Sequence, residues 1–523
     1  MQMAGTYLTP DINLAPSLTR RWHFAVQPPA YTLDAHVEPH TEHNMRATIR
    51  SLSLSWLLFA ALLSGVSVAQ DAGKSGAQAD STKPATKPDA TSAAPLPLPV
   101  FWALLFADEP AAQASLQRIR AGWSNAYAPL LIELFGEMRH PKIRSQVAQL
   151  LNRASGLGAG GVQINVAGWY EWLWSIDPGV HPDYAEFKAS YYELIDARFR
   201  EYFAGRPNTE IRLDEIRWGG VSRDGIPPLK NPKMIAAREA AYLGDGDIVF
   251  GVAIDGDVRA YPKRILAWHE MVKDRIAGRD LNGVYCTLCG SMILYDPMVN
   301  GVHHELGTSG FLYRSNKLMY DHATKSMWST LTGTPVVGAL TGRGIELKPL
   351  YVVTTTWKEW KRRHPNTLVL SLDTGHRRDY SEGAAYRDYF STDRLMFNVP
   401  KLDTRLANKA EVLALRFDGA RGEALAVAAA FLQSRPVYHD RIGTQAFVVL
   451  TDTGGANRVY ETRGIEFAAW NRNDEAKDTQ GRGWKVLEDR LAGPGGQSLA
   501  RLPAHRAFWF GWYSAYPGTR LVR

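Results

Sequence analysis

The chain has 523 residues, a formal net charge of +7 and a hydrophobic fraction of 45%. This length is enough for two or three folded domains. The basic residues form no dense patch, and the short run at 361–364 is typical of a solvated helix face, so we expect no nucleic-acid partner. Only two cysteines occur, which excludes a framework of several disulfides.

The N-terminal sequence has the features of an exported protein. Arg46 and Arg50 precede an apolar run at 52–63, and small residues follow at 67–69. This order is that of a secretory signal peptide, and the apolar run is shorter than the ~20 residues that span a bilayer. We expect a cleaved signal at 45–69, a periplasmic or secreted protein, and no stable transmembrane anchor after cleavage. The alternative is an uncleaved N-terminal anchor.

Two further segments flank this signal. Residues 1–44 come before it, although a signal normally begins its chain. We therefore expect Met45 to be the true start and 1–44 to be a non-native upstream extension. Residues 70–99 are rich in Ala, Ser, Lys, Asp, Thr and Pro and have almost no large apolar residues, which predicts a disordered linker.

Residues 100–210 have the apolar period of helices. Leu130, Leu131, Leu134, Phe135 and Met138 illustrate the recurrence at three- and four-residue steps. The same pattern predicts one helix over 182–203. The tryptophans and tyrosine at 169–174 are expected to pack in the core, because large aromatic side chains usually bury area rather than bind ligands.

From residue 211 onward the pattern changes to short β-prone runs separated by glycine turns. The sequence over 248–262 reads as a strand, an Asp-Gly turn and a second strand. The fold class is therefore expected to be α+β. We predict a helical N-terminal region followed by two tandem β-rich units, at 211–372 and 373–523.

The two β-rich units share a sequence frame. The pattern Trp357-x-x-Trp360-x4-Pro365-x-Thr367 recurs as Trp509-x-x-Trp512-x4-Pro517-x-Thr519. This recurrence predicts an internal duplication. The second copy is degenerate, because neither the cysteines nor the histidine of the first copy has a counterpart there. We therefore expect the first unit to carry the chemistry.

Both cysteines lie in one motif, Tyr285-Cys286-Thr287-Leu288-Cys289-Gly290. A thioredoxin-type dithiol precedes a helix, but the residues after Cys289 favour strand or turn. A strand, Cys-x-x-Cys-Gly and a strand form the layout of a metal knuckle. A metal site with both cysteines is the leading interpretation, and a redox dithiol or an inert disulfide remain alternatives.

Two cysteines do not complete a metal site. His269 is the favoured third ligand because it shortly precedes the motif and lacks a counterpart in the second unit. Met319 and Asp321 are two residues apart, so a strand would place both on one face. Two thiolates, an imidazole and a methionine would suit copper, whereas an aspartate in place of the methionine would suit zinc or iron.

Two other functions remain open. One is a thiol–disulfide oxidoreductase that cycles Cys286 and Cys289 between dithiol and disulfide. The other is a non-enzymatic envelope binding module in which the aromatic-rich second unit docks a partner and the cysteines form an inert disulfide.

A set of short motifs resembles one known family. They are Asp224-Gly-Ile-Pro227, Arg259-Ala-Tyr-Pro262, Trp268-His-Glu270, Tyr285-Cys-x-x-Cys-Gly290, Ser309-Gly310 with Leu312-Tyr313, Met319-Tyr-Asp321 and Ser326-x-Trp328. Together they resemble the domain of unknown function 3179, over about 211–370 and more weakly to the C-terminus. The resemblance implies an exported bacterial or archaeal protein and supports the choice of site residues. It implies no established activity. The family usually has proline where this chain has Thr287, a change that loosens the turn but keeps both cysteines.

Overall fold

The computed structural model describes residues 94–158, 163–417 and 422–523. The predicted extension 1–44, the predicted signal 45–69 and most of the predicted linker 70–99 lie outside these residues. The first described helix begins at Leu98, two residues before the predicted boundary. Within the described ranges, no helix has both the length and the apolar character needed to cross a membrane.

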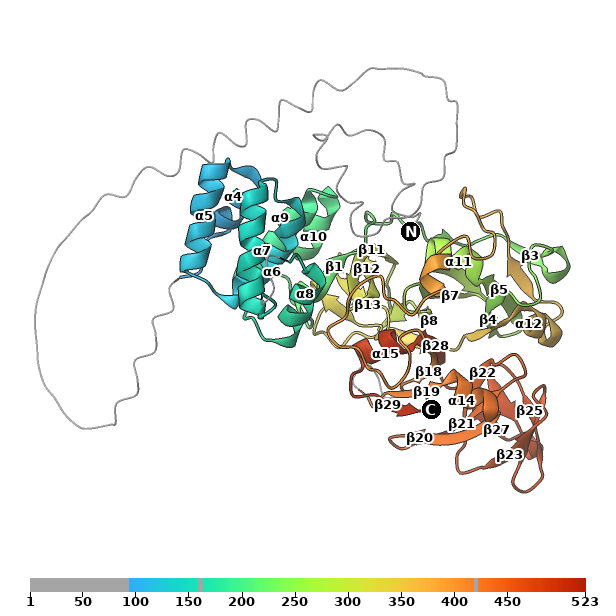
Figure 1. Cartoon of the computed structure of the whole chain (residues 1–523). Coiled ribbons are helices and arrows are strands. Elements are labelled where there is room, and N and C mark those ends of the chain that lie inside the picture. The colour runs from blue at the N-terminus through green and yellow to red at the C-terminus, as the bar shows by residue number, and fades with distance from the viewer. Residues whose placement is uncertain (1–93, 159–162, 418–421) are drawn as a thin grey trace, which may run out of the picture. The chain divides into compact units, whose positions relative to one another are not determined.

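The N-terminal region is helical (Figure 1). Its buried apolar side chains form a hydrophobic cluster that also includes Ile216, Phe311 and Leu318 of the β region. Its helices are α4 (Leu98–Phe106), α5 (Glu109–Ala121), α6 (Ala128–Leu134), α7 (Pro141–Ser155), α8 (Val166–Ser175), α9 (Tyr184–Glu193) and α10 (Arg200–Phe203). The aromatic residues at 169–174 lie on α8, and Trp169, Tyr170 and Trp174 are buried as expected. Proline at the start of α5, α6 and α7 fits a position where its missing N–H costs no helical hydrogen bond.

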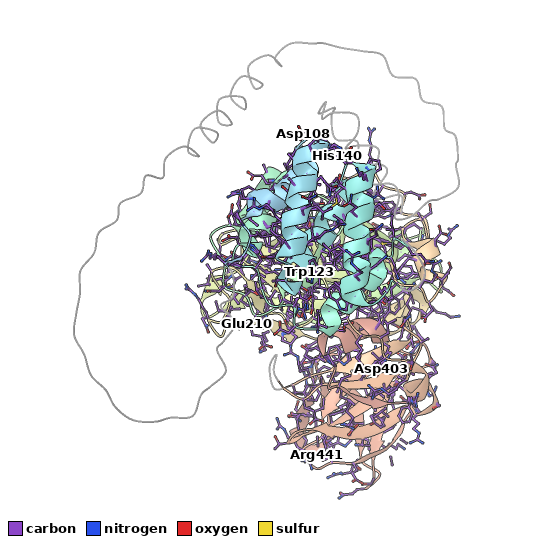
Figure 2. All side chains as sticks on the ribbon, turned by 60° about the vertical axis from the view of Figure 1, so that its left-hand side comes forward. Asp108, Trp123, His140, Glu210, Asp403 and Arg441 are labelled. Atoms are coloured by element: carbon purple, nitrogen blue, oxygen red, sulfur yellow. A yellow bond between two sulfur atoms is a disulfide. The ribbon has the colours of Figure 1, made fainter. Side chains whose placement is uncertain are left out.

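Helices α5 and α7 begin at the same end of this region (Figure 2). The carboxylate of Asp108 accepts a hydrogen bond from the backbone N–H of Ala111 at 2.9 Å and so caps α5. His140, directly before α7, lies with its Nε2 atom 3.0 Å from the carbonyl oxygen of Ala107. The two helix starts are therefore held together by polar contacts as well as by the core.

The single helix predicted over 182–203 is wrong. The chain leaves the helix after α9 and resumes it at α10. Between them, the carboxylate of Asp196 accepts a hydrogen bond from the backbone N–H of Arg198 at 3.0 Å and pairs with the Arg198 guanidinium at 2.7 Å. An aspartate that satisfies a nearby backbone donor starts a new helical turn rather than continuing the old one.

A buried ion pair connects the helices to the β region. The Nζ atom of Lys188 on α9 lies 2.7 Å from the Glu133 carboxylate on α6 and donates to the carbonyl oxygen of Ile216 at 3.0 Å. Both side chains are buried, so removing either one would leave the charge of the other uncompensated. Ile216 begins β1 (Ile216–Trp218), which makes this pair the junction between the two regions.

The first β unit contains three five-stranded sheets and one hairpin, in agreement with the α+β class (Figure 1). One sheet has the order β1, β11 (Leu306–Tyr313), β12 (Asn316–Asp321), β13 (Met327–Ser329) and β14 (Pro335–Val337). The next has the order β15 (Lys348–Leu350), β8 (Ser291–Asp296), β7 (Arg279–Cys286), β6 (Met271–Ile276) and β2 (Leu229–Lys230). The third has the order β16 (Val353–Thr356), β4 (Ile248–Ile254), β5 (Asp257–Pro262), β17 (Leu368–Leu370) and β3 (Met234–Ala236), and the hairpin pairs β9 (Met298–Val299) with β10 (Val302–His303).

The second β unit contains three sheets. They have the orders β28 (Ala504–Phe508), β18 (Glu411–Leu415), β19 (Leu425–Ala428), β29 (Arg520–Val522); then β20 (Val437–Ile442), β21 (Gln445–Thr451), β22 (Asn457–Glu461); then β23 (Phe467–Trp470), β24 (Glu475–Asp478), β25 (Gly483–Val486), β26 (Arg490–Ala492), β27 (Ser498–Ala500). The short helices of the β region are α11 (Lys263–His269), α12 (Trp357–Arg363), α13 (Arg387–Phe390), α14 (Ala429–Ser434) and α15 (Trp509–Ala515).

One sheet of each unit has the same arrangement of four strands. In the first unit, β16 pairs antiparallel with β4, β4 antiparallel with β5, and β17 parallel with β5. In the second unit, β28 pairs antiparallel with β18, β18 antiparallel with β19, and β29 parallel with β19. In both sheets a helix directly follows the third strand of this order: α11 follows β5, and α14 follows β19.

The recurring tryptophan and threonine motif makes the same hydrogen bond in both units. The indole Nε1 of Trp360 donates to the hydroxyl of Thr367 at 3.1 Å, and the Nε1 of Trp512 donates to the hydroxyl of Thr519 at 3.0 Å. All four side chains are buried. The hydrogen bond ties the helix that carries each tryptophan to the start of the next strand, which explains why indole and hydroxyl are spaced alike.

A buried charge network stabilises the turn between β21 and β22. The Arg458 guanidinium lies 2.8 Å from the Asp452 carboxylate and 2.9 Å from the Glu488 carboxylate. Arg363 on α12 also contacts Glu488, at 3.3 Å. Burial alone would raise the pKa of Glu488, but the charges of Arg458 and its neighbours hold it well below its usual value. The run at 361–364 is therefore not simply a solvated helix face, because Arg363 is buried in this network.

Replacing Arg458 tests how much this network stabilises the second unit. Arg458→Met leaves two buried carboxylates without their main cation, so we expect the free energy of unfolding to fall by about 3–5 kcal/mol. Urea unfolding measures the change. Arg463→Met is the matched control, because Arg463 is mostly exposed beside Glu461 and such pairs contribute about 0–1 kcal/mol. Equal losses in both variants would contradict this account.

Candidate functional site: the buried Cys286–Cys289 disulfide

The two cysteines occupy a tight turn between adjacent antiparallel strands. Cys286 ends β7, Ser291 begins β8, and the backbone N–H of Cys289 donates to the carbonyl oxygen of Cys286 at 3.1 Å. Gly290 has a φ of 60°, and a Cβ atom there would lie 2.9 Å from the ring of Phe508. The predicted layout of strand, turn and strand is confirmed, and glycine is required both by conformation and by packing.

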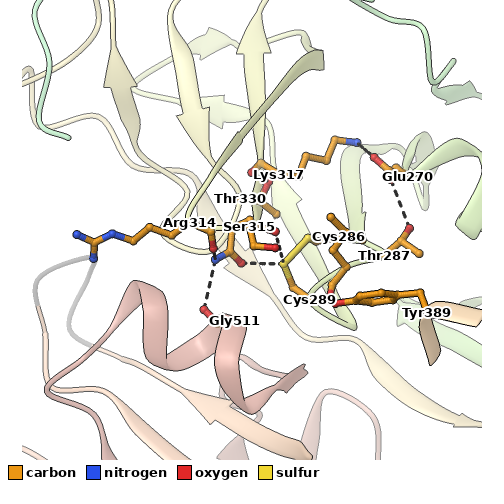
Figure 3. The surroundings of a disulfide bond; sticks show 12 residues. Glu270, Cys286, Thr287, Cys289, Arg314, Ser315, Lys317, Thr330, Tyr389 and Gly511 are labelled. Carbon is orange, nitrogen blue, oxygen red and sulfur yellow. Dashed lines mark hydrogen bonds and ion pairs between the residues drawn. A yellow bond between two sulfur atoms is a disulfide. The ribbon is translucent and has the colours of Figure 1, made fainter. Parts of the chain in front are cut away.

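The two sulfur atoms are bonded to each other as a disulfide, and both residues are buried. The Sγ atom of Cys289 lies 2.8 Å from Oδ1 of Asn316 and 3.5 Å from the carbonyl oxygen of Ser315. The Asn316 amide is oriented by its Nδ2, which donates to the carbonyl oxygens of Arg314 and Gly511 (Figure 3). Two oxygen acceptors therefore lie near the Cys289 sulfur.

A buried ion pair lies beside this turn (Figure 3). The Nζ atom of Lys317 lies 3.0 Å from Oε2 of Glu270, and both side chains are nearly inaccessible to solvent. Burial lowers the pKa of Lys317, and the Glu270 carboxylate opposes this shift. The hydroxyl of Thr287, the residue after Cys286, donates to Oε1 of Glu270 at 3.4 Å. The ion pair is thereby connected to the cysteine turn.

Apolar side chains enclose the disulfide. Its hydrophobic cluster contains Leu288, Tyr389, Val399, Phe508 and Phe510. The hydroxyl of Tyr389 donates to the carbonyl oxygen of Leu288 at 2.8 Å, and the backbone N–H of Phe508 donates to the carbonyl oxygen of Cys289 at 2.7 Å. The covering residues come from the segment 386–399 and from β28 and α15 of the second unit, so both β units build the site.

His269 is buried at the end of α11, and both of its ring nitrogens are occupied. Its Nδ1 atom lies 2.9 Å from the carbonyl oxygen of Pro227, so Nδ1 carries the proton. Its Nε2 atom lies 2.6 Å from the hydroxyl of Tyr380, which donates to it. Burial, with a smaller contribution from the charges of His376 and Arg378, lowers the pKa of His269 to about 4. The imidazole is therefore neutral near pH 7.

Met319 and Asp321 lie on β12, as their spacing predicted. Met319 is packed in an apolar cluster with Met271 and Trp328 rather than in the cluster of the cysteines. The Asp321 carboxylate contacts Nδ1 of His304 at 3.0 Å and accepts a hydrogen bond from the backbone N–H of Thr324 at 2.7 Å. Its role is to hold the turn after β12.

Of the five predicted metal ligands, the structure brings together only Cys286 and Cys289. Among the residues described, no group of three or more His, Cys, Asp or Glu side chains is placed to hold a metal ion. The copper, zinc or iron site therefore stays a prediction that the arrangement of these side chains does not support.

Sequence reasoning missed Lys317 and Asn316, which contact the site directly. Lys317 is two residues before Met319 on the same strand, so the period that placed Met319 and Asp321 on one face also applies to it. No stronger signal was available, because Lys317 follows the polar residues 314–316 and so does not interrupt an apolar run.

The fold and site define an α+β protein with a buried disulfide in its β-rich part. A family model described as protein of unknown function (DUF3179) matches residues 223–519, more than half of the chain. The chain therefore belongs to the DUF3179 family, as its motifs indicated. The match extends through the second β unit. Comparisons with curated proteins and with solved structures found no match.

The buried neutral His269 makes stability depend on pH. Its pKa is about 4 in the folded protein, against about 6.5 when unfolded. The contribution of neutral His269 to the free energy of unfolding is intact above about pH 6.5 and falls toward pH 4, because the unfolded chain binds the proton more readily. Over this range the free energy of unfolding falls by about 1.4 kcal/mol per pH unit. In His269→Asn, urea unfolding should give a slope that is shallower by about that amount over this range. An unchanged slope would contradict the assignment.

Proposed function

We propose that Cys286 and Cys289 form a redox-active pair that exchanges electrons with thiols. The observation that carries the proposal is a disulfide of neighbouring cysteines connected, through Thr287, to the buried Glu270–Lys317 ion pair. A buried ion pair carries a desolvation penalty, so its retention calls for a functional reason. An acid–base group beside a dithiol has one, because thiols must lose and regain protons during exchange.

A purely structural role for the disulfide has little support. A disulfide that closes a loop of about four residues stabilises the folded state by only about 2 kcal/mol in the chain-entropy model, less than longer loops gain. Backbone hydrogen bonds from Cys289 to Cys286 and from Phe508 to Cys289 already fix this turn. The turn between β21 and β22 closes with the N–H of Gly455 donating to Asp452 at 3.0 Å, without any cysteine.

In the proposed reaction a dithiol donor reduces the pair. A thiolate of the donor attacks one sulfur, the Cys286–Cys289 bond breaks, and a mixed disulfide forms. The second donor thiol then resolves the mixed disulfide. Two electrons and two protons pass to Cys286 and Cys289, and the donor leaves as a disulfide. Because both sulfurs are buried, the segment 386–399 moves aside to admit the donor.

The surroundings assign different roles to the two cysteines. In the reduced state, the thiol of Cys289 donates to Oδ1 of Asn316, an acceptor that stabilises the protonated form. Cys286 adjoins Thr287 and the Glu270–Lys317 pair. We assign Cys286 as the sulfur that becomes the thiolate, and Glu270 as the group that carries its proton.

We further propose that the protein is exported. The support is the sequence at 45–69, with its charged, apolar and small-residue order. An oxidising compartment suits a chain whose two cysteines form a disulfide.

We infer that the two β units arose by duplication of one ancestral unit. The supports are the recurring Trp-x-x-Trp frame, the matching strand order and directions, and the two equivalent hydrogen bonds from Trp360 and Trp512. The first copy kept or acquired the cysteines, and the second uses the buried Arg458 network at the corresponding turn.

Thiol titration tests the redox proposal. The native protein should show no free thiol, two after treatment with dithiothreitol, and none again after oxidised glutathione. Cys286→Ser with Cys289→Ser should lower the free energy of unfolding by no more than about 2 kcal/mol. Two free thiols accompanied by about one equivalent of bound metal would overturn the proposal in favour of the metal site. A disulfide that resists reduction until the protein unfolds would make it structural.

A set of charge variants tests Glu270. Glu270→Gln should slow reduction by dithiothreitol about a hundredfold, the lower range for loss of a general acid–base group. It also leaves Lys317 buried without its carboxylate, which destabilises the fold. Glu270→Gln with Lys317→Met removes both charges, so stability should recover while the reduction stays slow. Glu305→Gln is the control, because Glu305 pairs with Lys230 and Lys273 at the surface. Wild-type rates in the double variant would refute the role of Glu270.

A further inference from the structure

Two buried serine hydroxyls near the Cys286–Cys289 disulfide have no hydrogen-bond partner among the described residues. They belong to Ser291, at the start of β8, and to Ser315, in the turn between β11 and β12. The exposed fractions of these residues are 0% and 3%. A buried polar group without a partner costs free energy, so each such hydroxyl calls for a physical reason.

Ser291 shares one face of its sheet with Cys286. The two residues are directly opposite each other where β7 and β8 pair antiparallel. Side chains at opposite positions of an antiparallel pair lie on the same face, with their Cβ atoms about 4.5–5.5 Å apart. Rotation about a single side-chain bond of Ser291 therefore brings its hydroxyl within hydrogen-bonding reach of the Cys286 sulfur.

The two sulfur atoms have different surroundings. Acceptors lie near Cys289, because Oδ1 of Asn316 is 2.8 Å and the carbonyl oxygen of Ser315 is 3.5 Å from its Sγ atom (Figure 3). Acceptors of this kind suit a protonated thiol. Ser291 instead offers Cys286 a donor, and a donor suits a thiolate. The orphan hydroxyl of Ser291 thus lies opposite the cysteine to which the redox proposal assigns the negative charge.

The oxidation state of the pair decides how well this donor is used. A neutral sulfur atom is a weak hydrogen-bond acceptor. A thiolate carries a full negative charge, and hydrogen bonds to charged groups are about twice as strong as those between neutral groups. Cys286 is only 2% exposed, so water solvates such a charge poorly. A donor that lacks a partner in the disulfide and gains one on reduction favours the reduced state.

We propose that the Ser291 hydroxyl donates a hydrogen bond to the Cys286 sulfur in the reduced pair and thereby raises the reduction potential of the disulfide. This inference rests on the proposed redox function and extends it to the control of that function. The donor dithiol supplies both electrons for breaking the bond between the sulfur atoms. Ser291 keeps its proton throughout, so it forms and breaks no covalent bond.

Equilibration of the whole chain with reduced and oxidised glutathione tests the inference. Ser291→Ala should make the disulfide about tenfold harder to reduce, which is about 30 mV in potential, because a hydrogen bond to a charged group is lost. The shift should shrink below the pKa of Cys286, where the sulfur is a neutral thiol. In the oxidised protein, Ser291→Ala should not lower the urea midpoint of unfolding, because the hydroxyl has no partner there.

A thiolate titration gives a second readout that does not require the disulfide. Cys289→Ala leaves Cys286 as the one cysteine of the chain. The ultraviolet absorbance of its thiolate, followed against pH, measures the pKa of Cys286. Adding Ser291→Ala should raise this pKa by about one unit, the size expected for loss of one hydrogen bond to a charged group.

Thr355→Val is the matched control. Thr355 also has a buried hydroxyl that lacks a partner among the described residues, but it lies on β16 in another sheet. This variant should change neither the potential nor the pKa.

Three results would overturn the inference and leave a reversible dithiol intact. They are an unchanged potential or pKa in Ser291→Ala, a lowered urea midpoint of its oxidised form, and shifts that occur in Ser315→Ala but not in Ser291→Ala. A disulfide that is reduced only in the unfolded chain would overturn both the inference and the redox proposal.

Discussion

Glu270 and Lys317 place a carboxylate and an ammonium group in contact inside the protein, and three separate parts of the fold depend on this contact. Glu270 follows α11, Lys317 lies in β12, and Thr287 of the cysteine turn donates to the carboxylate. Removing either charge would leave the other buried and uncompensated. The constraint therefore fixes the end of α11 against β12 and the turn between β7 and β8 against both. It holds the disulfide turn beside the helix that carries His269.

The second β unit also has buried charged side chains at a turn between two strands. The turn between β21 and β22 contains no cysteine, and Arg458 pairs there with the buried carboxylates of Asp452 and Glu488. In the first unit, a single ion pair, Glu270 with Lys317, lies beside the disulfide.

Local patterns predicted more of this structure than long-range contacts did. The helical region and the strands around Cys286 and Cys289 follow from apolar period and turn residues, which are properties of neighbouring residues. The break after α9 was missed because it depends on one carboxylate, Asp196, which competes for a backbone donor. The hydrogen-bond partners of His269 could not be predicted from sequence, because Pro227 and Tyr380 are 42 residues before and 111 residues after it. Lys317 is likewise 47 residues from Glu270. Sequence can suggest that a histidine binds a metal, but the hydrogen-bond partners of its ring nitrogens are known only from the folded structure.

The turn at Cys289 is closed by the other half of the chain. The backbone of Phe508 donates to Cys289, Asn316 contacts Gly511, and a Cβ atom on Gly511 would lie 3.2 Å from the Cβ of Cys289. A gene fragment that encoded only the first β unit would contain both cysteines and the ion pair, but not the surface that seals them from solvent. The burial of the Cys286–Cys289 disulfide therefore depends on both halves of the chain.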